Sequence, residues 1–524
     1  MQATHLPARN PAAEAIFVSG RSWRLLYLIT VAFGILIQWL APHPPLTDMP
    51  QHAAQVALLR DILLGQSPWA NLFHVNWLTP YIIGYGLALP LSFLMPIATV
   101  FKLMLSVAYA AFVWLCILLR RHFGADARMD WLFLLPFFGF AYEWGFLTFL
   151  VAAPIGLWFI LLADRYAQAA TLKRGVGLSL VGLLLLASHG LVFAFAVAVG
   201  GLLLLARAGW RRTFGMRILP YVVLAIFCGI YFFISRQMQA GIQCEVCSQF
   251  IWSGGITRFP KMLVYALGVD TGGIEGKVFL PATLVMIALP WLLGLRINTG
   301  SKPSWIPFAT VTAIMLFVPT FALVTQFLYQ RFGLFLLPAY AWMFVGPPKT
   351  ATSPAMRTLS RLAIPLTVVC ILASLLVHAA KAWNFRQQTA EIDAQIMRLE
   401  PRQRALILMY DPRFSPSDKA KTYGHYPAWY QAERQGLVDF NFAWFPPQIV
   451  RYRPEHLPVV APGFEWHPER FEWNKYHGEN YHYFFVRHAS TEPADIFKGA
   501  PCAPVSIFKG GSWEIFERKA CNAG

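Results

Sequence analysis

The first long apolar run of the sequence is followed by the segment Pro44-Pro45-Leu46-Thr47-Asp48-Met49-Pro50-Gln51-His52-Ala53-Ala54-Gln55. A short helix from Gln51 to Leu64 is predicted here, because Pro50 suits a first helical turn, where its missing N–H costs no hydrogen bond. Asp48 lies where the partial positive charge of a helix start favours a carboxylate, and His52 follows one turn later on the same face. The segment therefore predicts a polar site beside an apolar run. The simpler alternative is that Asp48 is only a helix cap.

The composition of the whole chain is that of a membrane protein. Of its 524 residues, 57% are hydrophobic and only 13% are charged, against roughly 25% charged residues in ordinary globular domains. The formal charge of +17 would suit a nucleic-acid ligand, but the basic residues form short clusters between apolar segments, as in cytoplasmic loops. These clusters are Arg120 and Arg121, Lys173 and Arg174, Arg211 and Arg212, and Lys349, Arg357 and Arg361. We therefore expect a lipid bilayer as partner and no nucleic acid.

The positive-inside rule predicts how the first part of the chain lies in the membrane. The first run near the ~20 residues that span a bilayer is Trp23–Ala41, and two arginines at its start place Asp48 outside. If the long tract Thr79–Leu119 crossed twice, every later basic cluster would be external. A single crossing at Ala98–Leu119 keeps these clusters inside. We therefore expect Thr79–Pro96 to lie flat at the outer leaflet.

Nine further crossings follow in alternation, and because several are short we expect broken helices near the outer face. They are Trp131–Tyr142, Gly145–Ala163, Val176–Ala187, Leu191–Leu205, Ile218–Ile234, Val278–Leu295, Trp305–Val324, Phe332–Val345 and Ile364–Ala380. With about eleven transmembrane helices, the N-terminal tail (1–22) is cytoplasmic and the C-terminus periplasmic. The sequence thus predicts a multi-pass protein of the bacterial inner membrane. Its all-α membrane domain covers 23–381 and includes external loops at 42–97, with interfacial helices, and at 235–277.

The composition changes after Ala382, where polar and aromatic residues begin to alternate. A helix is predicted over Lys381–Glu400, and strands follow it. The last two strands read as a hairpin through Lys509-Gly510-Gly511-Ser512. Residues 382–524 are therefore predicted to form a small periplasmic α/β domain, long enough to bury its own core. Its predicted strands are Ala405–Tyr410, Gly436–Phe440, His482–Val486, Val505–Phe508 and Trp513–Glu517.

The seven cysteines divide according to this topology. Four of them fall in the oxidising space, where disulfides form. Cys502 and Cys521 bracket the terminal hairpin and are expected to bond to each other. Cys244 and Cys247 are expected to form a local disulfide, with a redox pair or half of a metal site as alternatives. The other three lie in crossings, where a thiol usually only packs: Cys116, Cys228 and Cys370.

The C-terminal domain also contains a group of histidines that invites a metal site: His477, His482 and His488, with Glu479. Spacings of five and six residues do not fit one face of a helix, and on a strand the side chains divide between its two faces. We therefore assign no metal site here. The aromatic and histidine side chains of this domain could instead line a groove for a glycan or peptide acceptor.

Polar residues near membrane depth all fall on the outer side of the predicted topology, and ionisable groups at that depth are costly, which favours a functional site. A polar rim is the simpler explanation. Two carboxylates and an arginine come from three separate loops, and this arrangement favours a functional site. A site for a phosphate-bearing lipid needs a cation to bind the phosphate and a carboxylate to hold a metal or to deprotonate an acceptor. The outer residues are Asp48, His52, His74, Glu143, His189, Gln326 and Arg331.

This arrangement resembles the GT-C superfamily of integral membrane glycosyltransferases. The resemblance rests on the first crossing, the external segment Thr47–Ala54, the flat element Tyr81–Leu94, the crossing that ends in Leu118-Leu119-Arg120-Arg121, and Gln330-Arg331-Phe332 leading into Leu337-Pro338. In that superfamily the first external loop carries interfacial helices and an acidic residue, the next external loop often adds a second acidic residue, and a later arginine contacts the donor phosphate.

The resemblance implies transfer of a sugar from a polyprenyl-phosphate-linked donor to a glycan, lipid or protein acceptor of the cell envelope. Asp48 would be the base or a metal ligand, Glu143 the second acidic residue, and Arg331 the partner of the lipid phosphate. A divalent cation (Mg²⁺ or Mn²⁺) stays open, because the second loop has one carboxylate where a pair is expected. Further residues expected to bind substrate are His52, His189 and Gln326.

Two other functions compete with the glycosyltransferase. The chain could be a non-catalytic membrane protein that supports an envelope-polysaccharide or export assembly through its external domain. It could also be a transporter, but no ionisable residue lies in mid-helix and no paired broken repeats are visible, as transporters would require. The Asp48 and Arg331 pair discriminates between the first two functions, because an enzyme needs both residues in one cavity.

Overall fold

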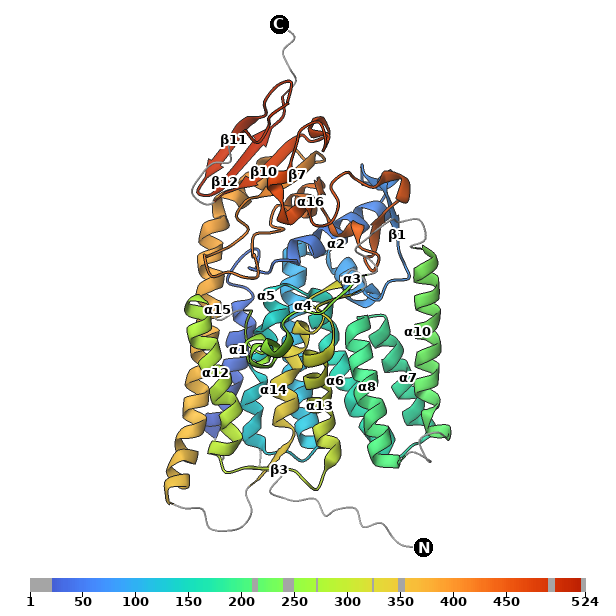
Figure 1. The fold of residues 1–524 in the computed structure, drawn as a ribbon, viewed down its shortest axis with the longest axis vertical. Coiled ribbons are helices and arrows are strands. Elements are labelled where there is room, and N and C mark those ends of the chain that lie inside the picture. The colour runs from blue at the N-terminus through green and yellow to red at the C-terminus, as the bar shows by residue number, and fades with distance from the viewer. Residues whose placement is uncertain are drawn as a thin grey trace.

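The computed structural model describes residues 21–209, 215–238, 249–269, 272–322, 325–346, 354–488 and 495–519. Within these ranges a bundle of helices carries a mixed α/β layer at one end (Figure 1). Five of the described helices are long and apolar enough to cross a membrane. They are α4 (Ile97–His122), α6 (Leu147–Gln168), α8 (Gly190–Ala208), α12 (Gly273–Leu292) and residues Leu359–Arg398 of α15 (Pro354–Arg398).

Shorter apolar helices complete the bundle, and they fall on the runs predicted from the sequence. Apolar side chains project from its outer surface, among them Leu28 at 63%, Phe233 at 64% and Val369 at 62% exposure. Large exposed apolar patches are unusual on soluble monomers and typical of lipid-facing surfaces. The predicted combination of an apolar helical domain with a C-terminal mixed sheet is confirmed. The shorter helices are α1 (Arg21–Ile37), α7 (Leu172–Leu186), α10 (Leu219–Met238), α13 (Ile306–Phe317) and α14 (Gly333–Ala341).

The run Trp131–Tyr142 does not form the continuous helix that a simple crossing would need. Pro136 lacks a donor for the helical ladder, and Gly139 has an extended backbone that lies close to the carbonyl of Ala266. The whole run is buried in protein, which is where broken backbone is tolerated in membrane proteins. It consists of η3 (Ala127–Phe133), η4 (Pro136–Phe138) and α5 (Phe140–Glu143).

The loop between α1 and α4 covers the end of the bundle that faces the α/β layer (Figure 1). It contains α2 (Met49–Leu63), β1 (Phe73–Val75) and α3 (Ile82–Leu91). The predicted helix is thus confirmed as α2, and α3 occupies the element that was expected to lie flat. β1 pairs antiparallel with β9 (Val450–Tyr452) of the C-terminal part. This long-range pairing ties the first loop to the α/β layer.

The C-terminal part is built on a five-stranded sheet in the order β11-β12-β10-β7-β8. β7 is parallel to both β8 and β10, and β12 is antiparallel to β10 and β11. The predicted terminal hairpin is confirmed, with Gly511 in its turn at φ 57°. α15 joins this sheet to the bundle without a break, so the predicted last crossing and helical linker are one helix of 45 residues. The elements are β7 (Arg404–Met409), α16 (Ala428–Arg434), β8 (Leu437–Asp439), β10 (Tyr483–Arg487), β11 (Val505–Gly510) and β12 (Trp513–Glu517).

Several short elements connect the helices of the bundle. The small sheet β2-β4-β5 leads into the turn that carries Arg331, and α11 packs against the same turn. β3 pairs with β6 at the end of the bundle away from the α/β layer (Figure 1). These elements are β2 (Phe250–Ile251), α11 (Arg258–Tyr265), β3 (Arg296–Ile297), β4 (Phe321–Ala322), β5 (Thr325–Gln326), η9 (Gln330–Phe332) and β6 (Phe344–Val345).

Candidate active site between the helix bundle and the C-terminal domain

Asp48 immediately precedes α2, and hydrogen bonds hold its backbone on both sides. Its N–H donates to the carbonyl of Trp144 over 3.0 Å, and its carbonyl accepts from the N–H of His52 over 3.1 Å. The carboxylate makes no capping hydrogen bond and instead lies 3.5 Å from Nε2 of His425. Asp48 thus occupies the N-cap position of α2 without capping the helix through its side chain, and a role in ligand binding stays a prediction.

Arg331 lies in the turn η9, and its side chain is held in one orientation. Nη2 donates to the carbonyl of Gln326 over 2.8 Å, and Nε donates to the carbonyl of Phe327 over 3.2 Å. The guanidinium covers the ring of Phe146 at 3.7 Å from the ring centroid. Phe327 has a left-handed φ of 57°, which costs of order 1–3 kcal/mol for a non-glycine residue and is typical of functional sites. The cation is thus preorganised, with 9% of Arg331 exposed.

Asp48 and Arg331 share a site with little access to water, which changes the pKa of both groups. Burial raises the pKa of Asp48 to about 7, the charge of Arg331 lowers it, and the charge of Glu465 raises it. Burial lowers the pKa of Arg331 to about 10. Among the described side chains no hydrogen bond or ion pair joins Asp48 directly to Arg331. The two residues predicted to act together are therefore brought together, and both charges can act on a bound ligand.

His52 belongs to a buried chain of polar groups one turn after Asp48. The Tyr85 hydroxyl donates to Oε1 of Gln448 over 2.5 Å, and Nδ1 of His52 lies 2.8 Å from the same hydroxyl. Because a hydroxyl has one proton, His52 must donate from Nδ1, and its Nε2 keeps a free lone pair. Burial lowers the pKa of His52 to about 3, so the ring is neutral at pH 7.

His189 is the N-cap of α8, and it offers an unused donor. Its Nδ1 accepts the N–H of Leu191 over 3.2 Å, so the neutral ring carries its proton on Nε2. This Nε2 is buried and has no hydrogen-bond partner among the described residues. Burial, and to a smaller degree the charge of Arg331, lowers the pKa of His189 well below its usual range. The ring of Tyr81 lies 5.2 Å away. An orphaned donor beside a buried cation is the geometry of a ligand site.

Two residues of the C-terminal domain complete the surroundings of Asp48, and the sequence did not indicate either. His425 is buried, its pKa is lowered by burial to about 4, and its Nδ1 has no partner in the described part of the chain. Glu465 lies in η12 (Phe464–Trp466), and burial raises its pKa to about 7. Both lie far along the chain from Asp48 and in no local motif, so only the docking of the domain onto α2 reveals them.

Glu143 contacts the Asp48 segment through its backbone only. Its carbonyl accepts from both the N–H and Oγ1 of Thr47 at 3.5 Å. Its carboxylate pairs with Lys381 and lies 3.3 Å from Nδ1 of His378, both on α15. Burial raises the pKa of Glu143, but Lys381 and His378 outweigh burial and lower it to about 2. The carboxylate is thus engaged by α15, and a catalytic role for Glu143 stays a prediction.

A cavity of about 380 Å³ adjoins this site. We call it the aromatic cavity, because aromatic rings dominate the wall that the helix bundle supplies. Trp144 connects it to Asp48 through the backbone hydrogen bond described above, and two glutamines of its wall, Gln326 and Gln330, shortly precede Arg331 in sequence. Gln326, which the sequence predicted to bind substrate, thus lines a cavity. The bundle residues of its wall are Phe140, Trp144, Tyr265, Val269, Gln326, Phe327 and Gln330, and the C-terminal domain adds Lys419, Lys421 and Trp466.

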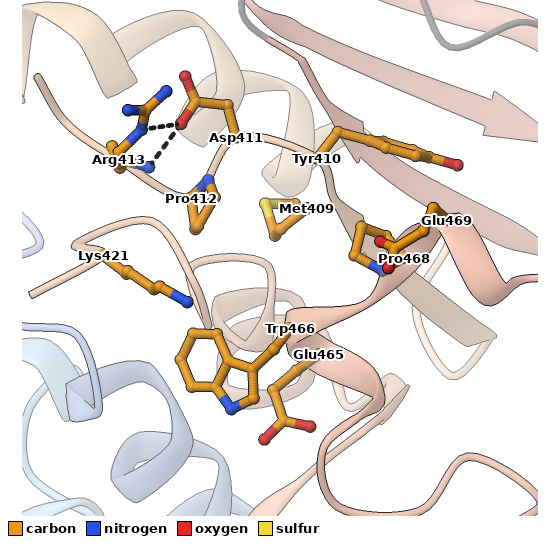
Figure 2. Close-up of a pocket in the computed structure, with 10 residues that line it drawn as sticks. All are labelled: Met409, Tyr410, Asp411, Pro412, Arg413, Lys421, Glu465, Trp466, Pro468 and Glu469. Carbon is orange, nitrogen blue, oxygen red and sulfur yellow. Dashed lines mark hydrogen bonds and ion pairs between the residues drawn. The ribbon is translucent and has the colours of Figure 1, made fainter. Parts of the chain in front are cut away.

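A second cavity, of about 280 Å³, lies within the C-terminal domain (Figure 2). We call it the polar cavity, because three carboxylates and two cations line it. Figure 2 shows the Lys421 side chain directed toward the indole of Trp466, with Nζ 4.0 Å from the ring centroid. Lys421 and Trp466 line both cavities, so the two spaces share a wall. The other residues of the polar cavity are Met409, Tyr410, Asp411, Pro412, Arg413, Glu465, Pro468 and Glu469.

The described residues include no group of three or more His, Cys, Asp or Glu side chains that could hold a metal ion. Asp48 has a single imidazole neighbour at 3.5 Å and a cation nearby, so this set does not fit a divalent cation, and we derive no step through one. The three histidines of the C-terminal domain that invited a metal site form separate pairs with carboxylates instead of one cluster. These pairs are His477 with Glu479, His482 with Glu517, and His488 with Glu514.

The cysteines agree with the predicted division as far as the structure describes them. Cys502 is disulfide-bonded. Cys521, Cys244 and Cys247 lie outside the described residues. The three cysteines of the helix bundle are free thiols, as expected: Cys116, Cys228 and Cys370.

Comparison with known proteins identifies the architecture through structure alone. No protein-family model matches the sequence, and no curated protein matches it significantly. The crystal structure of ArnT from Cupriavidus metallidurans bound to undecaprenyl phosphate matches with a TM-score of 0.57 and 11% identity, over 96% of this chain and 98% of that chain.

Cryo-EM structures of the arabinofuranosyltransferase AftD from Mycobacteria also match. One has a TM-score of 0.49 and 14% identity, and a mutant has a TM-score of 0.50 and 13% identity. This chain spans only 40% and 41% of those AftD chains. The match to ArnT extends over nearly the whole of both chains, and it includes the C-terminal domain that the sequence resemblance left out. The chain therefore has the fold of ArnT, which is the fold that the resemblance of its first external loop to the GT-C glycosyltransferases led us to expect.

Proposed function

We propose that this protein transfers a sugar from a polyprenyl-phosphate-linked donor to an acceptor at the site formed by Asp48 and Arg331. The observation that carries the proposal is the meeting of these two residues beside the aromatic cavity. A buried cation suits a phosphate, and a carboxylate whose pKa lies near 7 suits a general base. ArnT, which has this fold, was solved with undecaprenyl phosphate bound, and this supports a lipid phosphate as ligand.

In the proposed reaction the acceptor oxygen attacks the anomeric carbon of the donor sugar, with inversion. The acceptor proton goes to the Asp48 carboxylate while the new carbon–oxygen bond forms. The bond from the anomeric carbon to the phosphate oxygen breaks, and its electron pair stays on the phosphate. Arg331 stabilises this departing charge in a site with little water, where electrostatic stabilisation is strong. The Nε2–H of His189 offers a further donor to the donor headgroup, and His52 orients the substrate from the other side.

We place this site at the periplasmic face. The charge pattern favours eleven crossings with a cytoplasmic N-terminus, and the described elements supply eleven apolar segments when η3, η4 and α5 count as one. α4 begins beside α3 and ends in the basic residues Arg120 and Arg121, at the far end from the α/β layer (Figure 1). With the basic end inside, α2, α3 and the C-terminal domain lie outside, and a prenyl chain can stay in lipid while its headgroup reaches Asp48.

The direct test replaces Asp48 by Asn and measures transfer from a mixture of polyprenyl-phosphate-linked sugars to cell-envelope acceptors by mass spectrometry. We expect transfer to fall on the order of 10²–10⁴-fold, the usual contribution of a general base. Asp61→Asn on the same helix is the matched control, because Asp61 pairs with Arg60 outside the site. Unchanged transfer by the Asp48 variant would remove Asp48 from the mechanism. Absence of transfer by the native protein with every donor would favour the non-catalytic envelope-assembly function.

A further inference from the structure

The polar cavity of the C-terminal domain is adjacent to the proposed reaction centre. Nε2 of His425 lies 3.5 Å from the Asp48 carboxylate, and the His425 ring lies 5.9 Å from the ring of Trp466. Trp466 lines both cavities. Glu465 also lines the polar cavity. It is near enough to Asp48 for its negative charge to raise the pKa of Asp48. A molecule in the polar cavity therefore lies against the same ring that borders the aromatic cavity.

The two cavities differ in chemistry. The wall of the aromatic cavity comes mainly from the helix bundle and is rich in rings, which suits a lipid-linked ligand. The polar cavity is built from the C-terminal domain alone and carries charged groups on several sides (Figure 2). An apolar chain placed there would leave those charges unpaired, which is costly. A reaction with two substrates needs two separate binding spaces, one for each substrate, next to the catalytic base.

The charges of the polar cavity favour a hydroxyl-rich ligand over an anionic one. Carboxylates are hydrogen-bond acceptors only, and three face this space: Asp411, Glu465 and Glu469. Of the two cations, Arg413 is committed to Asp411 at 2.8 Å. Lys421 lies over the Trp466 ring, where it can still donate to a ligand. The indole provides an apolar wall for the C–H face of a sugar ring, since aromatic faces attract partly positive hydrogens.

We infer that the polar cavity binds the acceptor of the transfer and that this acceptor presents a terminal saccharide, held against Trp466 and hydrogen-bonded by the surrounding carboxylates. This inference rests on the proposed function, because it assigns the second substrate of the same site. The volume of about 280 Å³ is at the lower end of small-molecule pockets, roughly 300 Å³. The cavity thus takes an acceptor end and not a long stretch of chain.

The test measures saccharide binding by the full-length protein in lipid nanodiscs with saturation-transfer NMR. The probes are the methyl glycosides of glucose, galactose, arabinose, N-acetylglucosamine and glucosamine. We expect at least one to bind the native protein and Trp466→Leu to weaken its binding on the order of tenfold, the effect of about 1.4 kcal/mol. Trp444→Leu is the matched control, because Trp444 is also half-buried in this domain but lines neither cavity; this variant should bind the saccharide like the native protein.

A second measurement separates this inference from the proposed function. Native mass spectrometry with undecaprenyl phosphate reports donor-side binding by the native protein, and the thermal unfolding midpoint shows whether Trp466→Leu is folded. If the native protein binds undecaprenyl phosphate but none of the saccharides, or if Trp466→Leu binds them as well as the native protein does, the saccharide inference is wrong and the proposed function stands. If undecaprenyl phosphate does not bind at all, the proposed function itself fails.

Discussion

Three histidines surround Asp48 and Arg331, and burial keeps each of them neutral at pH 7. The pKa of His52 is lowered to about 3, that of His425 to about 4, and that of His189 well below its usual range. Neutral imidazoles can hydrogen-bond a substrate, and their low pKa keeps them from competing for the proton that the proposed mechanism gives to Asp48. The site therefore has a buried cation for the phosphate and a candidate base, Asp48, whose pKa of about 7 predicts transfer that rises with pH through neutrality.

Glu465 makes this pH dependence testable at a single residue. Its negative charge raises the pKa of Asp48, so Glu465→Gln removes a repulsion and lets Asp48 ionise at lower pH. We expect the acid limb of the rate profile to move to lower pH by up to about one pH unit. The measurement is the pH dependence of transfer under saturating donor. Glu469→Gln, at an exposed carboxylate paired with His467, should leave the limb where it is. A limb that stays fixed in Glu465→Gln would show that Asp48 is not the titrating group.

At the scale of elements, α15 supports the Asp48 segment through Glu143. The Glu143 carboxylate is held by Lys381 and His378 of α15, while the backbone of Glu143 and Trp144 receives hydrogen bonds from Thr47 and Asp48. Thr47 Oγ1 also donates to the carbonyl of Ala420 over 2.8 Å. The start of α2 is therefore positioned by two other parts of the chain, the loop before α6 and the C-terminal domain.

Replacing Lys381 by Met tests this support. Lys381 and Glu143 are both buried, and removal of one partner of a buried ion pair typically costs ~3–5 kcal/mol because the other charge stays unpaired. We expect a lower thermal unfolding midpoint in detergent. The double variant Lys381→Met with Glu143→Gln should recover much of the loss, because the fully buried carboxylate no longer carries an unpaired charge, whereas Glu275, the other partner of Lys381, is 29% exposed. If the double variant is no more stable than Lys381→Met, the ion pair is not what stabilises this junction.

At the scale of the whole molecule, His43 connects the segment before α2 with α15 and α16. Its Nδ1 lies 3.1 Å from Asp393 and its Nε2 2.8 Å from Glu433, and its ring stacks on Trp429 at 4.1 Å. Burial lowers the pKa of His43, but the hydrogen bonds and charges of Asp393 and Glu433 outweigh burial and raise it to about 9. The docking of the domain onto the bundle therefore includes a buried imidazolium.

The raised pKa of His43 makes this docking depend on pH. The protonated ring contributes stability fully below its unfolded pKa of about 6.5, and this contribution is lost as pH rises through about 9. We expect His43→Gln to be less stable than the native protein by on the order of 3 kcal/mol at pH 6, since one pKa unit corresponds to about 1.4 kcal/mol. The gap should close near pH 10, as measured by thermal unfolding. His467→Gln, at an exposed histidine, should show no such trend. A gap independent of pH would contradict the charged state of His43.

Local patterns in the sequence were sufficient for most helices, for the strands of the C-terminal sheet and for two residues of the candidate site. Apolar run lengths and basic clusters predicted the helices, because spanning length and loop charge are read directly from the chain. Alternation and glycine turns predicted the strands of the C-terminal sheet. Pro50 and Asp48 marked the start of α2, and Arg331 stood out as a cation at membrane depth. The break in the run Trp131–Tyr142 was harder to predict from the sequence, because burial in protein, and not local propensity, permits broken backbone there.

The composition of the site depended on contacts that no local pattern encodes. His425, Glu465, Lys421 and Trp466 approach Asp48 only because β1 pairs with β9 and α2 packs on α16. Another long-range contact, with Lys381 and His378 of α15, engages the Glu143 carboxylate. The length of an apolar run and the charge of a loop are short-range properties, so the chain alone determined the helices of the bundle, the start of α2 and the choice of Asp48 and Arg331 as candidate site residues. The neighbours of those residues, and the pKa values that burial gives them, arise from long-range docking and could be known only once the domain lay on the bundle.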